Sequence, residues 1–239
     1  MTLLTDRPSA AVERSGRELL LLWHNPGTRS FVKAGLLSIA AEGYRFRYAE
    51  EARADPEFFP LGEFPQLDGE YRSSSMPPFF ANRVMSSART SYDDYLRWLA
   101  LEAESPDLPV EILVRTGASR ATDTFHVVEK PARGARSFVS RFFVSGIGHL
   151  PAPTGLDEAL RTGDHVLLEQ EGDNVVNADA HRVVSLRGVQ IGWVPDWLCG
   201  EVAELADAGW RFEAIAEKVS PEAPAHVRVL CRLTAHRDA

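Results

Sequence analysis

Short apolar runs recur about every dozen residues between Phe142 and Asp196, and this spacing constrains the fold more than any other feature of the chain. The runs are rich in Val, Ile, Leu and Phe, with Gly, Asp, Asn and Pro between them; they occupy 142–149, 163–168, 180–184 and 190–195. Strands at such even spacing, bounded by turn residues, are typical of a small antiparallel barrel or sandwich rather than of alternating βαβ units. The sequence therefore predicts an antiparallel β-domain here.

Length and charge limit the possible functions. With 239 residues, the chain can form one large or two small domains. The net charge of −8 disfavours broad, non-specific phosphate binding, which needs a basic field. A local basic groove stays possible, because four basic residues fall within a segment free of acids: Lys130, Arg133, Arg136 and Arg141. We favour a solvated linker for that segment.

The cysteines and the N-terminal residues indicate the cellular compartment in which the protein is expected. Cys199 and Cys231 lie too far apart for a metal knuckle, and one pair is no disulfide framework, so we expect buried free thiols in a reducing cytoplasm. No apolar run approaches the roughly 20 residues of a membrane helix. Residues 1–15 are polar and carry acids, unlike a secretory signal. We expect a cytoplasmic protein with a disordered tail over residues 1–16.

The N-terminal half predicts a meander sheet with short helices. Strands are expected over 18–24, 31–40 and 44–48, and the third alternates aromatic residues with arginine, as a strand with one buried face does. Repeated prolines exclude a regular helix over 56–77. Beyond them we expect short helices over 78–83, from an N-cap at Ser91, and over 110–114, then a strand over 122–129. A five-residue aromatic set is interpreted as core rather than as a docking surface: Phe58, Phe59, Phe64, Phe79 and Phe80.

The C-terminal half predicts strands with one longer helix. A bent strand or strand pair is expected over 137–149 and a helical turn over 154–160. Further strands are expected over the ranges 163–171, 180–186, 189–194, 210–219 and 226–233. A helix opens at Pro195 and ends at Gly209, because Leu198, Val202 and Leu205 recur at helical spacing.

The order of these C-terminal elements resembles the HIRAN domain, over about 137–234. The resemblance implies an OB-like small β-barrel with one or two helices, within an α+β chain, and nucleic-acid binding more than catalysis. With it we expect an N-terminal domain over 17–130, a linker over 131–136 and a HIRAN-like domain over 137–235. HIRAN domains occur beside helicases and as free-standing bacterial proteins.

The resemblance also implies a site. HIRAN domains hold a 3′ DNA end with an Arg-Tyr pair after the first strand, an Asn-Pro-Tyr-Asp turn, and a residue after a later glycine. By position these fall on Gly148 and His149, on 174–177, and on Trp193. The arginine and both tyrosines are replaced, and Asn177 stands where an acid would bond the terminal hydroxyl. The predicted nucleic-acid-binding residues are His149, Asn174, Asn177, Arg182 and Trp193.

Two of these residues have structural alternatives. His149 and Trp193 each have a flat π-face that can stack a base, but Trp193 can equally pack beneath the helix that opens at Pro195. Asn174 can bind nucleic acid or simply hold the backbone of its own turn. The sequence leaves both questions open.

The N-terminal half resembles the N-terminal subdomain of HipA-type toxin kinases, over about 19–129. The segments that carry the resemblance are 44–48, 59–61, 78–82 and 115–117, whereas the family's Leu-Leu-Pro-Glu-Gly loop is replaced at 83–87. The kinase body is absent, so phosphorylation by that route is excluded. The resemblance implies a domain that docks a partner protein, or an antitoxin-like partner of a HipA-type kinase that binds no DNA.

No catalytic motif is present in the sequence. The chain lacks a phosphate-binding loop of the Gly-x-x-x-x-Gly-Lys-Ser/Thr type, a Gly-x-Ser-x-Gly elbow and a His-Glu-x-x-His pair. Segment 146–148 is interpreted as a bend at a strand end. His149, His165 and His181 could converge on zinc, but their spacing fits no ligand pattern. We therefore predict a non-catalytic, cofactor-free bacterial nucleic-acid-binding adaptor; a metal-dependent hydrolase of DNA processing is a minor alternative.

Overall fold

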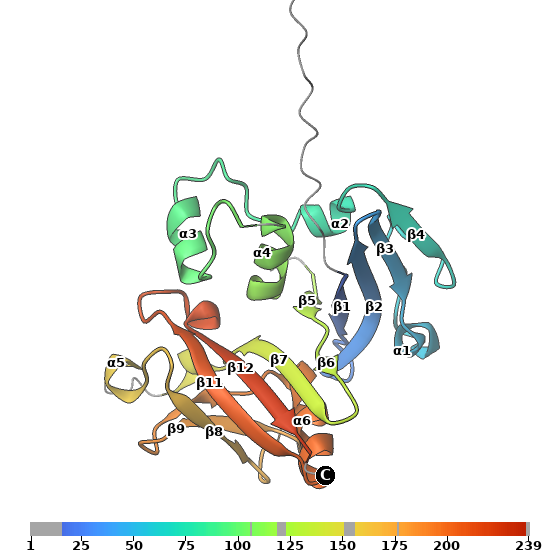
Figure 1. The fold of residues 1–239 in the computed structure, drawn as a ribbon. Coiled ribbons are helices and arrows are strands. Elements are labelled where there is room, and N and C mark those ends of the chain that lie inside the picture. Colours follow the sequence, from blue (N-terminus) through green and yellow to red (C-terminus); the bar gives the residue numbers. More distant parts are fainter. Residues whose placement is uncertain (1–15, 106, 119–122, 151–155, 176, 238–239) are drawn as a thin grey trace, which may run out of the picture.

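The computed structural model describes residues 16–105, 107–118, 123–150, 156–175 and 177–237, with two antiparallel sheets and few helices (Figure 1). The N-terminal sheet has the strand order β4-β3-β2-β1-β5. Its strands are β1 (Arg17–His24), β2 (Phe31–Ala40), β3 (Gly43–Tyr48), β4 (Glu70–Ser73) and β5 (Phe125–Glu129). The predicted three-strand meander is confirmed. In β3 the aromatic residues are buried and the arginines exposed.

Two short elements of this half, one helix and one strand, were not predicted. Helix α1 (Glu50–Ala54) follows β3 directly, and β4 has four residues among the prolines. Helices α2 (Pro78–Ala81) and α3 (Tyr92–Trp98) lie where short helices were expected. Ser91 is the N-cap residue of α3, but its side chain makes no capping hydrogen bond. Helix α4 (Leu108–Thr116) exceeds its predicted range at both ends and stops at Gly117, whose φ of 66° favours glycine.

Aromatic rings fill the N-terminal core. The Phe46 ring lies 4.4 Å from the Phe64 centroid and 5.8 Å from the Phe80 centroid. Phe58, Phe64 and Phe80 are buried, which confirms the core interpretation for these three. Phe59 contradicts it, because its residue is 77% exposed. Phe59 lies with Pro60 and Leu61 in a segment without regular secondary structure, which leaves its ring exposed.

The C-terminal sheet has the strand order β10-β9-β8-β11-β12-β7-β6. Its strands are β6 (Ala132–Arg133), β7 (Ser137–Phe143), β8 (His165–Gln170), β9 (His181–Ser185), β10 (Gln190–Trp193), β11 (Arg211–Val219) and β12 (Val229–His236). Ser145, just after β7, exchanges two backbone hydrogen bonds with Trp193 of β10, at 2.8 and 2.9 Å. This bridge connects β10, the strand at one edge of the sheet, to the segment that follows β7, which lies near the opposite edge. The finer description as an OB-like barrel stays a prediction.

Helix α6 (Asp196–Asp207) packs inside this half. Leu198, Val202 and Leu205 are buried, as their spacing predicts, and share a core with strands β7 to β12. Gly209 follows the helix with a φ of 75°. Both cysteines are buried and free, as expected, and burial raises the pKa of the Cys199 thiol to about 11 and that of Cys231 to about 12.

Several boundaries differ from the prediction. Strand β7 ends at Phe143, and a bend leads to the short 3-10 helix η1 (Ile147–His149). Helix α5 (Leu156–Ala159) covers part of the predicted turn, and 154–155 lie outside the described residues. His226 belongs to the 3-10 helix η2 (Ala225–Val227) rather than to β12, because Pro224 opens a helical turn there.

The segment 131–136, expected to be a linker, holds β6, which pairs with β7. Its basic neighbourhood is largely neutralised. Lys130 lies 2.6 Å from Glu18, Arg133 3.2 Å from Glu204, and Arg141 2.8 Å from Glu217. These basic side chains therefore offer little free charge to phosphates.

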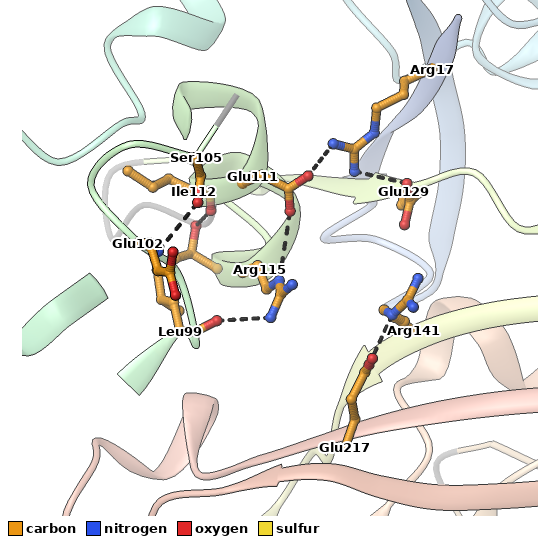
Figure 2. Close-up of polar contacts among 11 residues, drawn as sticks. Arg17, Leu99, Glu102, Ser105, Glu111, Ile112, Arg115, Glu129, Arg141 and Glu217 are labelled. Atoms are coloured by element: carbon orange, nitrogen blue, oxygen red, sulfur yellow. Dashed lines mark hydrogen bonds and ion pairs between the residues drawn. The ribbon is translucent and has the colours of Figure 1, made fainter. Parts of the chain in front are cut away.

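The two halves pack against each other through α3, α4 and η2. Leu96, Leu99 and Ile112 form one apolar cluster with Ala223 and Val227 of the C-terminal half. Beside it, Figure 2 shows an ionic group in which Arg17 contacts Glu111 and Glu129, with the Arg141–Glu217 pair nearby. The pKa of the Arg141 guanidinium is raised, first by Glu217 and also by Glu129 and Glu111 of the N-terminal half. Within the described ranges, no helix is long and apolar enough to cross a membrane.

Candidate nucleic-acid interface

A cleft of about 880 Å³ lies between the two halves. The N-terminal half contributes residues from β2, α3, α4 and β5, and the C-terminal half contributes the bend after β7, the turn before β9, and the β10–α6 junction. Its volume falls in the range of small-molecule sites, about 300–1,000 Å³. Four of the five predicted residues line it: His149, Asn174, Asn177 and Trp193.

Trp193 is held on three sides. Its backbone forms the bridge to Ser145, and its Nε1 donates a hydrogen bond of 2.8 Å to Glu171 Oε2. Its ring lies over Gly146, where an added Cβ would approach a ring carbon to 2.5 Å. Trp197, four residues on, and Trp210 pack against the C-terminal core. The structure therefore places the Trp193 ring against the bend at 146 rather than beneath α6.

Asn174 organises its own turn. Its Oδ1 accepts a hydrogen bond from the Asn177 backbone N–H at 3.0 Å, and its Nδ2 donates to Glu171 Oε2 at 2.6 Å. The turn-holding interpretation is thus confirmed, although the residue also lines the cleft. Val175 is 98% exposed. Val176 of the predicted turn lies outside the described residues.

Asn177 positions a carboxylate that the sequence analysis did not select. Its Oδ1 accepts a hydrogen bond from the Asp179 backbone N–H at 2.8 Å, and its Nδ2 donates to Asp196 Oδ1. The acceptor that we expected Asn177 to offer is therefore already engaged. Asp196, the first residue of α6, lines the cleft while its Oδ1 accepts the hydrogen bond from Asn177. Its place after Pro195 was interpreted only as a helix start, so no local signal distinguished it.

Glu171 is a second residue that the sequence analysis missed. One of its oxygens accepts hydrogen bonds from both Asn174 and Trp193. These two hydrogen bonds hold the pKa of the carboxyl below its usual value, and the bond from Asn174 has the larger effect. An ionised Glu171 therefore ties the ring of Trp193 to the turn that carries Asn174.

Residues 137–236 match the sequence model of the HIRAN domain. They form a HIRAN domain. The crystal structure of the human HLTF HIRAN domain is 20% identical and covers 43% of this chain and 79% of that one, with a TM-score of 0.32. A crystal structure of a Lactobacillus plantarum protein is also 20% identical, covering 41% and 99%, with a TM-score of 0.33.

One curated relative spans both halves. Human heparan sulfate glucosamine 3-O-sulfotransferase 6 is 25% identical over an alignment 219 residues long, and the alignment covers 81% of this chain. The chain spans 59% of the length of that relative. The HIRAN match begins at 137, so the HipA-like resemblance of the N-terminal half stays a prediction.

Two predicted residues of the HIRAN domain differ in their setting. His149 is exposed at the end of η1, and its backbone N–H donates to Gly146 at 2.9 Å. Arg182 is not among the described residues that line the cleft. It lies on β9 opposite Trp193 and Glu169, and its guanidinium pairs with Glu169 at 3.1 Å. The HIRAN domain therefore brings four of the five predicted residues together and leaves Arg182 on the sheet.

The three histidines considered for zinc lie in separate settings. His165 is exposed and 3.8 Å from Glu213, whereas His181 is buried with its Nδ1 2.8 Å from the Asp179 carbonyl oxygen. In the part of the chain that the structure describes, no group of three or more His, Cys, Asp or Glu side chains could hold a metal ion.

Two other histidines of the cleft predict a pH-dependent stability. Burial lowers the pKa of His126, and the neighbouring His24 lowers it further. Burial also lowers the pKa of His226. As the pH falls through about 6.5, the unfolded chain binds protons that the folded chain does not, so stability is lost on acidification. We expect the thermal midpoint, followed by circular dichroism, to fall as the pH drops below about 6.5.

Replacing His126 by phenylalanine should make this decline shallower, because one of the two groups no longer titrates. The exposed His165, changed to alanine, is the matched control and should leave the decline unchanged. Equal pH profiles for His126→Phe and the wild type would contradict the prediction.

Proposed function

We propose that the cleft binds single-stranded DNA or a DNA end, and that the protein does so as a non-catalytic adaptor. One observation carries the proposal. The positions that correspond to HIRAN contacts line a single cleft: His149, Asn174, Asn177 and Trp193. The HIRAN match over 137–236 supports DNA as the ligand.

The chemistry of the cleft favours bases over phosphates. The Trp193 ring offers a stacking face, and base–aromatic stacking contributes about 1–3 kcal/mol per base. Among the described residues, two arginines line the cleft and both are paired, Arg83 with Asp123 and Arg141 with Glu217. Bases of a duplex are stacked and cannot reach such a ring, so we propose a preference for unpaired strands and frayed ends. Because the described part of the cleft offers few free cations, we expect binding to depend only weakly on salt.

Sulfate transfer is not part of this proposal. The name of the curated relative describes a sulfotransferase, and a sulfate donor is an anion. Among the described residues, the arginines that line the cleft are neutralised by carboxylates, and Asp196 adds a further negative charge.

Fluorescence anisotropy with labelled oligonucleotides tests the proposal. We expect a short single strand and a 3′-tailed duplex to bind at least about tenfold more tightly than a blunt duplex, a difference of about 1.4 kcal/mol. The difference should persist when the salt concentration is raised. Absence of binding at low salt by folded protein would instead favour the alternative, a protein-interaction module without DNA binding.

A further inference from the structure

The wall of the cleft on the N-terminal side carries a row of aromatic rings. Phe31 of β2 and His126 of β5 both line the cleft, and their ring centroids lie 5.0 Å apart at an interplanar angle of 82°. His24 of β1 continues the row, 5.1 Å from Phe31. All three side chains are half-buried, so each ring is fixed by its neighbour while part of it stays accessible.

A second feature of this wall comes from the helices. Tyr95 of α3 and Thr116 of α4 also line the cleft, and burial raises the pKa of the Tyr95 hydroxyl. Thr116 donates to the Ile112 carbonyl at 2.8 Å. Tyr95 and Thr116 therefore line the same cleft as Phe31 and His126.

The helices of this wall pack directly against the HIRAN domain. Leu96, Leu99 and Ile112 of the same two helices are buried against Ala223 and Val227 of the HIRAN domain. The aromatic row and Trp193 are therefore held across one cleft by a shared apolar contact. Such an arrangement is preorganised, and it reduces the cost of ordering a flexible ligand.

We propose that the N-terminal half forms the second wall of the DNA site, where Phe31 and His126 stack an unpaired base next to the one held by Trp193. This inference rests on the proposed function and deepens it, since it assigns the N-terminal half a direct part in binding. A HIRAN domain alone would then hold only half of the site.

The nature of the wall favours a base over other ligands. Burial keeps His126 neutral near physiological pH, so it meets a ligand as a flat ring rather than as a cation. Rings on two walls suit an unstacked strand whose bases are splayed apart, because every base has a π-face. The volume of about 880 Å³ limits the occupant to a short segment.

Binding of single-stranded DNA by His126→Ala, His126→Phe and His165→Ala tests the inference. We expect His126→Ala to weaken binding about five- to tenfold, the lower part of the range for one stacked base. His126→Phe keeps a stacking face and should recover most of the affinity that His126→Ala loses. His165→Ala, the same substitution at an exposed site outside the cleft, should retain wild-type affinity.

Photocrosslinking supplies an independent readout. A single strand carrying 5-iodouracil should crosslink the wild-type protein within the peptides that contain Phe31 or His126, in addition to the peptide of Trp193. Crosslinks confined to the HIRAN domain, with unchanged affinity in His126→Ala, would overturn the inference while the proposed function stands. If the wild-type protein binds no DNA at all, the proposed function fails, and the inference fails with it.

Discussion

Replacement of Trp193 by alanine should weaken binding of single-stranded DNA by about 1–3 kcal/mol, because it removes one stacking face from the cleft. The ring is held over Gly146 and tied to Glu171, so no reorganisation is needed when a base arrives. Fluorescence anisotropy with the folded variant measures the loss. Trp193→Phe, which keeps a ring but loses the Nε1 donor, should lose less.

Trp210 provides the matched control. It is half-buried, packs against the core of the HIRAN domain at the start of β11, and does not line the cleft among the described residues. Trp210→Ala should therefore leave the affinity of the folded protein unchanged. Wild-type affinity in a folded Trp193→Ala variant would remove Trp193 from the binding site.

The second prediction concerns Arg83, whose side chain is only 2% exposed. Its guanidinium donates to both oxygens of Asp123 at 3.2 and 2.5 Å and to the Ala118 carbonyl, and it lies 4.2 Å from the Phe79 ring centroid. Removal of one partner from a fully buried pair leaves an uncompensated charge, at a cost of about 3–5 kcal/mol, and we expect the lower end here because the Asp123 side chain is 27% exposed. Asp123→Asn should lower the free energy of unfolding, measured with urea, by about 3 kcal/mol.

An exposed pair offers the comparison. Asp68 contacts Arg53 at 3.3 Å and its side chain is 91% exposed, so Asp68→Asn should change stability by less than about 1 kcal/mol. The double variant Arg83→Met with Asp123→Leu should recover part of the loss, since it leaves no buried charge. If Asp123→Asn costs no more than Asp68→Asn, the buried pair is not what stabilises this region.

The sequence predicted what local patterns determine. Alternation and turn residues located the main strands, and the spacing of Leu198, Val202 and Leu205 located α6. Elements of two to five residues, such as α1, β4 and β6, were missed because they carry too few positions to show a period. The ends of α4 were misplaced because they are set by the left-handed backbone conformations of Asp107 and Gly117, which the apolar spacing does not reveal.

The candidate site was predictable only on its HIRAN side. The resemblance gave His149, Asn174, Asn177 and Trp193, but the pairing of Arg182 with Glu169 depends on the register between β8 and β9. The hydrogen bond from Asn177 to Asp196 spans the turn and α6, and the wall at Phe31 and His126 depends on how α3 and α4 pack on η2. Such contacts between distant segments leave no periodic signal in the chain.

If the cleft binds DNA as proposed, the bridge between Ser145 and Trp193 couples closure of the sheet to occupation of the cleft. The same residue joins β10 to the segment after β7 and lines the cleft. Under the proposed function, a molecule with this bridge open would therefore have no correctly placed ring for a base. The apparent affinity is then the intrinsic affinity scaled by the fraction of closed molecules. Gly192 protects that fraction, because any side chain there would press on the Ser145 carbonyl at 2.3 Å. A substitution at Gly192, which bears no side chain to touch DNA, would thus weaken recognition by depopulating the competent state.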